Sequence, residues 1–71
     1  MNQVVKKRLH YRVIVTLKSG AAFEGVLWEQ DREALVLRDT QAIPGPNQAP
    51  VPVDGELLVF VADVDYIQKP K

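Results

Sequence analysis

The fold is decided by residues 11–30, YRVIVTLKSGAAFEGVLWEQ, in which two alternating segments flank a turn. One face of the first segment, residues 11–18, is apolar and carries Tyr11, Val13, Val15 and Leu17. A period of two is typical of a half-buried strand. Gly20 ends a turn signal after this strand, because glycine adopts positive φ without steric cost. The stretch therefore predicts an antiparallel hairpin with strands over residues 11–18 and 21–30.

Gly25 lies in the middle of the second predicted strand, where Phe23 and Leu27 share its inward face. A glycine inside a strand permits a sharp bend, which a small barrel needs in order to close. After a polar turn, a third strand is predicted over residues 34–39, with Leu35 and Leu37 on one side. The chain is thus expected to curl into a small, strongly bent sheet.

The fourth predicted strand, residues 56–62, contains the run Leu57-Leu58-Val59-Phe60-Val61, which is apolar on both faces. A strand that is apolar on both faces is normally buried on both. Because so small a sheet has one interior, the second face needs another chain or a helix. A fifth strand is predicted over residues 64–68, before Pro70 stops the pairing.

Two segments do not follow the strand pattern. Residues 2–9 place Val5 and Leu9 on one helical face, which predicts a short N-terminal helix capped by Asn2. Residues 40–54 contain four of the five prolines and are predicted to form an extended loop.

The 71 residues are interpreted as a single domain, 1–71, without disulfides, because the chain has no cysteine. A domain of this size buries only about 60% of the surface that its unfolded chain exposes, so additional stabilisation is expected. One histidine, His10, makes a metal site improbable. Oligomerisation is the remaining route, and the first predicted partner is a second copy of the chain.

Several classes of function find no support in the sequence. No apolar run approaches the length of a membrane span and no signal peptide is evident, so an intracellular, cytoplasmic protein is expected. His10 has no evident Ser or Asp partner, and the four glycines are too scattered for a phosphate loop. We therefore expect no enzyme, no cofactor and no small-molecule substrate.

The nine basic and nine acidic residues balance, yet the charges are unevenly distributed. The first 23 residues carry five cations and no acid, and four of these cations form the candidate nucleic-acid-binding cluster Lys6, Lys7, Arg8 and Arg12. Such a cluster tracks a phosphate backbone or simply forms a solvated face. Both interpretations stay open.

The segment from Val15 through Phe23-Glu24-Gly25 and Asp31 to Leu37 resembles the first motif of the Sm-like (LSm) family. The later segment from Leu58 to Ile67 is similar to the second motif in its hydrophobic outline. The resemblance implies a helix followed by a five-stranded, strongly bent antiparallel barrel. It also implies that the fourth strand pairs with the fifth strand of a neighbour in a ring. The candidate subunit interface is then Leu58, Val59, Phe60, Val61, Tyr66 and Ile67.

The resemblance carries RNA recognition over only in part. Family members hold uridine with an Asp and an Asn in the turn between strands two and three and with an Arg-Gly pair after strand four. Asp31 matches, and Arg32 beside it is a further candidate for contact with a base or phosphate. Val61-Ala62 stands where Arg-Gly is expected, which implies that the uridine pocket is absent or altered.

The sequence thus predicts a non-enzymatic, homo-oligomeric, ring-forming assembly module with single-stranded RNA as a candidate partner. The alternative is a structural or accessory protein, for example of phage origin, that binds no nucleic acid. Trp28 is predicted to point outward, either as an interface residue or as a cover for the sheet.

Overall fold

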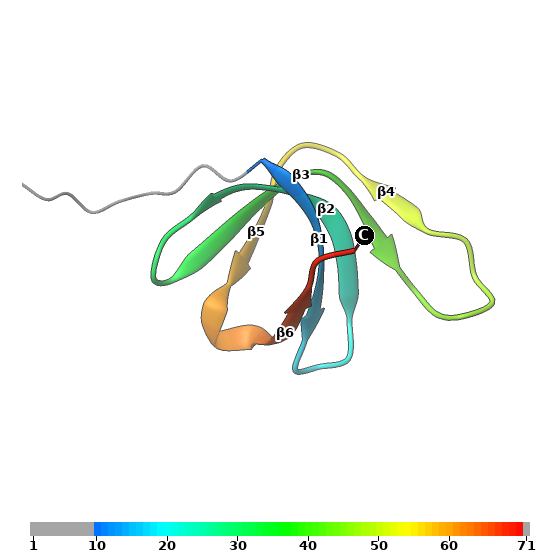
Figure 1. The fold of residues 1–71 in the computed structure, drawn as a ribbon. Coiled ribbons are helices and arrows are strands. Elements are labelled where there is room, and N and C mark those ends of the chain that lie inside the picture. The colour runs from blue at the N-terminus through cyan, green and yellow to red at the C-terminus, as the bar shows by residue number, and fades with distance from the viewer. Residues whose placement is uncertain (1–9, 71) are drawn as a thin grey trace, which may run out of the picture.

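The computed structural model describes residues 10–70, which form one antiparallel sheet of six strands (Figure 1). The strands are β1 (Tyr11–Leu17), β2 (Ala22–Gln30), β3 (Ala34–Ile43), β4 (Val51–Val53), β5 (Leu57–Phe60) and β6 (Val64–Gln68). A single 3₁₀ turn, η1 (Val61–Asp63), joins β5 to β6.

The central strands follow the chain order, and β3 has two partners on its outer side. The order is β4-β3-β2-β1-β6, with β5 also paired to β3. The first half of β3 pairs with β5 from Ala34 to Leu37, and the second half pairs with β4 from Thr40 to Ala42. Asp39 lies between the two halves with a φ of 51°. This left-handed residue marks the place where β3 changes partner.

The sheet is strongly curved, because β5 and β6 lie at its opposite edges and yet are joined by only three residues. Four strand spacings would separate these edges by about 19 Å in a flat sheet. A three-residue 3₁₀ turn advances only about 6 Å. Two register shifts between β2 and β3 help the sheet to bend, since bulges increase the local twist. Figure 1 shows the resulting arch, with η1 connecting its two sides.

The predicted closed barrel is wrong. β5 pairs with β3 and β6 pairs with β1, but no ladder joins β5 to β6, so the sheet stays open. The physical reason is that the predicted strand 56–62 stops at Phe60, where the chain turns into η1 instead of running alongside β6. The helix predicted over residues 2–9 lies outside the described residues, and residues 10–70 contain no α-helix.

The prediction that residues 40–54 form an extended loop is also only partly right, because both ends of this stretch belong to paired strands. β3 continues through Thr40 to Ile43, and Val51–Val53 returns as β4 to pair with it. Pro52 is tolerated because β4 is an edge strand, where a missing N–H can face away from the ladder. The loop proper is the connection between β3 and β4.

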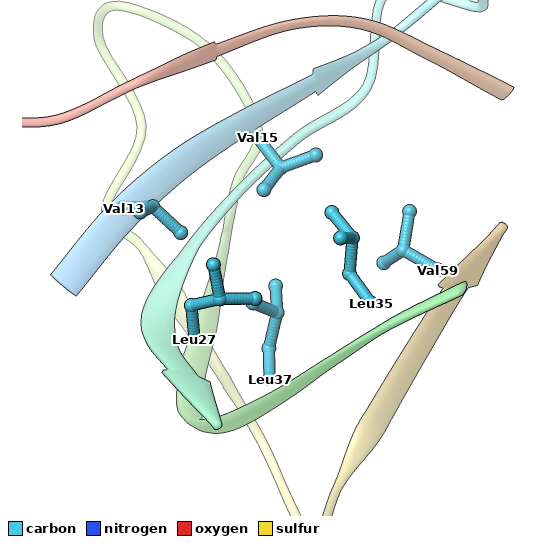
Figure 2. Packing of buried hydrophobic residues seen from close by; sticks show 6 residues of the cluster. All are labelled: Val13, Val15, Leu27, Leu35, Leu37 and Val59. Atoms are coloured by element: carbon cyan, nitrogen blue, oxygen red, sulfur yellow. The ribbon is translucent and has the colours of Figure 1, made fainter. Parts of the chain in front are cut away.

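The core lies on the concave side of the sheet and comes from four strands. Its buried side chains are Val13, Val15, Leu27, Leu35, Leu37 and Val59. Figure 2 shows these six side chains directed toward one another from β1, β2, β3 and β5. They alternate with less buried residues along each strand, which is the period-two pattern of a sheet with one buried face.

Gly25 allows β3 to approach β2 closely at the register shift between Glu24 and Val26. A Cβ atom at this position would lie 2.6 Å from Thr40 Oγ1 and 3.1 Å from the carbonyl oxygen of Arg38. Thr40 itself is buried, and its hydroxyl has no hydrogen-bond partner among the described residues. The close approach of the two strands therefore leaves a polar atom in an apolar position.

Replacement of Thr40 by Val is expected to stabilise the protein. Val has nearly the same shape and removes a buried hydroxyl that makes no hydrogen bond to residues 10–70, a defect worth about 1–3 kcal/mol. A gain of about 1 kcal/mol raises the melting temperature of a domain this small by about 4–8 °C. Differential scanning calorimetry of T40V beside T40S, which keeps the hydroxyl, checks this, and a lower melting temperature for T40V would contradict it.

Candidate functional site

The edge formed by β5 exposes large apolar side chains. Leu58 and Phe60 are 55% and 53% exposed, and Val61 at the start of η1 is 38% exposed. Val59 points the other way and belongs to the core, with 5% exposure. Four of the six predicted interface residues lie here, but Val59 is already covered by its own chain. This strand is therefore apolar on both faces, with only one face covered.

The edge formed by β6 has the same character. Tyr66 and Ile67 are 52% and 44% exposed. Tyr66 lies opposite Thr16 of β1, whereas Ile67 lies opposite the buried Val15. The two side chains consequently project from opposite faces of the sheet. Ile67 is on the core side but stays partly exposed, because the open sheet does not cover it.

The turn η1 is hydrogen-bonded to both sides of the arch. The Val61 N–H donates to the carbonyl oxygen of Glu33, and the Lys18 N–H donates to that of Asp63, each at 2.8 Å. Glu33 belongs to the β2–β3 turn and Lys18 to the β1–β2 turn. These two hydrogen bonds fix the position of the β5 edge relative to the β6 edge.

A shallow depression lies where η1 meets the β2–β3 turn. Its lining is formed by Arg32, Glu33, Phe60, Val61, Ala62 and Asp63. The floor is mainly apolar and the rim carries charges of both signs. The depression could not be predicted from the sequence, because it depends on the contact between segments that are far apart in the chain.

Asp31 is a structural residue of the β2–β3 turn. Its Oδ1 accepts hydrogen bonds from the backbone N–H groups of Glu33 and Ala34, at 2.8 and 2.9 Å. The Asp31 N–H in turn donates to the carbonyl oxygen of Ala34. An Asp that holds the backbone of its own turn is a common arrangement. The candidate RNA contact at Asp31 would thus have to share a carboxylate that the turn already uses.

Removal of this carboxylate is expected to loosen the turn. Asp31→Ala deprives two backbone N–H groups of their acceptor and should cost about 1 kcal/mol of stability, as the loss of a similar capping side chain does. Asp31→Asn keeps an acceptor oxygen and should cost less. Urea denaturation followed by circular dichroism measures both variants, and equal stability of D31A and the parent protein would refute this role.

Of the candidate nucleic-acid-binding cations, the structure describes only Arg12 and Arg32, and it does not bring these two together in one site. Arg12, on β1, forms an ion pair with Asp39 at 2.9 Å, so its charge is partly neutralised. Arg32 is exposed on the β2–β3 turn. Lys6, Lys7 and Arg8 lie outside the described residues.

Trp28 lies between two planar groups from the neighbouring strands. The ring of His10, just before β1, stacks on it with centroids 4.0 Å apart, and the guanidinium of Arg38 on β3 lies 4.1 Å from the ring centre. Arg38 also pairs with Glu56, through a hydrogen bond of 2.8 Å from Nε. Trp28 therefore covers the outer face of the sheet and already has contacts within the chain. Arg38 is a partner that the sequence analysis missed, although its outward position in the strand alternation was a signal.

Comparison of the sequence with models of known protein families and with curated proteins finds no match. Within residues 10–70, no helix has the length and apolar character needed to cross a membrane. The same residues contain no group of three or more His, Cys, Asp or Glu side chains placed to hold a metal ion.

Proposed function

We propose that this protein is a non-enzymatic assembly module whose copies join through the exposed edges of β5 and β6. One observation carries the proposal. Six large apolar side chains are exposed among residues 10–70, and all but Val51 lie on β5, η1 or β6. Exposed apolar side chains gathered on edge strands indicate an interaction site, and edge strands with unpaired backbone groups pair readily with other strands.

The chemistry of these edges favours a second copy as the partner. An edge strand satisfies its N–H and C=O groups by pairing with another edge strand, and β5 and β6 are two such strands in each copy. A contact between two different edges repeats from copy to copy, so it closes into a ring or continues as a filament. The resemblance to the Sm-like family supports this, because it implies pairing of the fourth strand with the fifth strand of a neighbour.

Light scattering after size-exclusion chromatography tests the proposal. The expected result is a single species whose mass is a multiple of 8.0 kDa. The oligomer should keep its mass as the salt concentration rises, because the contact between its copies is mainly apolar. A monodisperse monomer at every protein concentration would sink the proposal.

RNA binding is a second candidate function, favoured by the run Lys6-Lys7-Arg8. In an oligomer the run would be repeated once per copy, which multiplies a modest charge. Because Arg12 is paired with Asp39, we expect the run and not Arg12 to dominate any binding to phosphate.

Fluorescence polarisation with labelled oligo-U and oligo-A at two salt concentrations tests this candidate. Binding through phosphate contacts weakens as salt rises. Reversing the charges of Lys6, Lys7 and Arg8 should abolish it, whereas Lys18→Glu serves as a matched control on the β1–β2 turn. If the parent protein binds neither oligonucleotide, RNA binding is refuted and the purely structural role remains.

A further inference from the structure

The depression between η1 and the β2–β3 turn has an exposed apolar floor. Phe60 and Val61 contribute to this floor and are 53% and 38% exposed. The Val61 N–H donates to the carbonyl oxygen of Glu33 at 2.8 Å, so the two walls lie side by side (Figure 1). The cavity has a volume of about 590 Å³. Pockets of about 300–1,000 Å³ commonly hold ligands, so this one has room for several side chains.

The rim of the depression carries more negative than positive charge. Glu33 and Asp63 lie on opposite walls, together with the cation of Arg32. Neither carboxylate forms an ion pair within residues 10–70. Opposite charges across a contact favour association and select the partner. The depression is therefore suited to an occupant that combines apolar side chains with neighbouring cations.

The N-terminal segment, residues 1–9, has this composition. It contains Val4 and Val5, directly followed by the basic run Lys6-Lys7-Arg8, and it contains no acid. The segment is also attached to the sheet that carries the depression, and a short tether gives its end an effective concentration in the millimolar range. A weak contact is then enough to keep the segment bound, so a separate protein of similar composition is at a disadvantage.

The point of attachment places the segment within reach of the depression. The His10 N–H donates to the carbonyl oxygen of Leu27 at 2.7 Å, and the His10 ring stacks on Trp28. Asp31, where the β2–β3 turn begins, lies three residues beyond Trp28, about 10 Å along the strand. The six residues from Val4 to Leu9 extend to about 20 Å. The segment is therefore long enough to bring its apolar pair to the wall that this turn forms.

We propose that the N-terminal segment docks in this depression of its own chain. Val4 and Val5 then contact the apolar floor, and the basic run lies against the acidic rim. This contact is separate from the proposed assembly. Val59 points into the core, so the neighbouring Phe60 side chain lies on the outer face, and docking there leaves the backbone groups of the β5 edge available. Because the basic run is also the candidate contact to phosphate, docking and RNA binding compete for it.

Disulfide cross-linking of the full chain tests the docking, since the chain contains no cysteine of its own. V4C/A62C joins the segment to the depression, which Ala62 lines. V4C/A49C is the matched control, because Ala49 is likewise an exposed alanine but lies in the connection between β3 and β4. We expect V4C/A62C to lose its free thiols under mild oxidation about tenfold faster than the control, because docking raises the local concentration of the two cysteines. The product should run as a single chain on a denaturing, non-reducing gel.

A third variant keeps the tether and changes only the charges. Reversal of Lys6, Lys7 and Arg8 to Glu in the V4C/A62C background should slow the cross-linking toward the rate of the control. V5C/A62C serves as a second pair should V4C/A62C fail to fold. Equal rates for the A62C and A49C pairs, or no effect of the charge reversal, would overturn the proposal. Cross-linked dimers in place of single chains would also overturn it, because the occupant would then be the segment of another copy. Light scattering of the reduced variants reports on the assembly separately, so either proposal can fail without the other.

Discussion

Phe60→Asp is expected to convert the assembled protein into monomers. Phe60 is 53% exposed on the free edge of β5, so the change costs the isolated chain little. In the assembly the new carboxylate would be buried against the neighbouring copy, at a cost of several kcal/mol for an unpaired charge. Each 1.4 kcal/mol weakens association tenfold, so the effect should amount to several orders of magnitude. Light scattering across a range of protein concentrations measures it.

Val51→Asp is the matched control for this prediction. Val51 is equally exposed, at 53%, but lies on β4, away from β5 and β6. We expect V51D to keep the mass of the parent protein. An unchanged mass for F60D, or an equal loss of assembly in both variants, would count against the β5 edge as the contact surface.

Gly25→Ala is expected to produce the largest loss of folding stability from a single added methyl group. The added Cβ would approach Thr40 Oγ1 to 2.6 Å and the Thr40 Cα to 3.1 Å. The Thr40 Cα and the Arg38 carbonyl are backbone atoms, which cannot rotate aside. Overpacking of this kind costs about 1–3 kcal/mol, and the close backbone atoms of β3 put this site at the upper end. Urea denaturation at one fixed protein concentration measures the change.

Gly45→Ala is the control, because a Cβ atom there would meet only Gln48 Oε1, at 3.9 Å. The double variant G25A/T40A should recover part of the loss, since it removes Oγ1 but not the backbone contacts. A G25A protein as stable as G45A would contradict the close approach of β3 to Gly25.

Most of the core could be predicted from alternation alone. Val13 and Val15 in β1, and Leu35 and Leu37 in β3, were assigned to single faces, and the structure buries all four. The reason is physical, because side chains of successive residues in a strand point to opposite faces. A strand with one buried face therefore has an alternating pattern of apolar and polar residues in its sequence.

The openness of the sheet could not be predicted in the same way. The apolar pattern of residues 56–62 is compatible with a long strand, whereas the chain leaves β5 after Phe60 and enters η1. Whether two edges close onto each other depends on backbone hydrogen bonds, and all residues except proline share the same backbone groups. The short strand β4 was missed because the prolines around it masked a pairing that is allowed at an edge.

The candidate interface stays a prediction. The two-sided apolar pattern of Leu57–Phe60 predicted that one face of this strand lacks cover from the sheet, and Leu58 and Phe60 are 55% and 53% exposed among the described residues. The roles of Asp31 in its turn and of Trp28 between His10 and Arg38 needed the three-dimensional arrangement. Such contacts depend on the distance and orientation between side chains, and the type of each residue does not determine these.

The three-residue turn η1 has a consequence for stoichiometry. It is hydrogen-bonded to Glu33 on one side and to Lys18 on the other, so it sets the angle between the β5 and β6 edges. In a cyclic assembly that uses both edges, this angle is the wedge that each copy contributes to a full circle. A wider wedge closes with fewer copies and a narrower one with more. The subunit number of such a ring would therefore be determined by a segment that contributes little to the core.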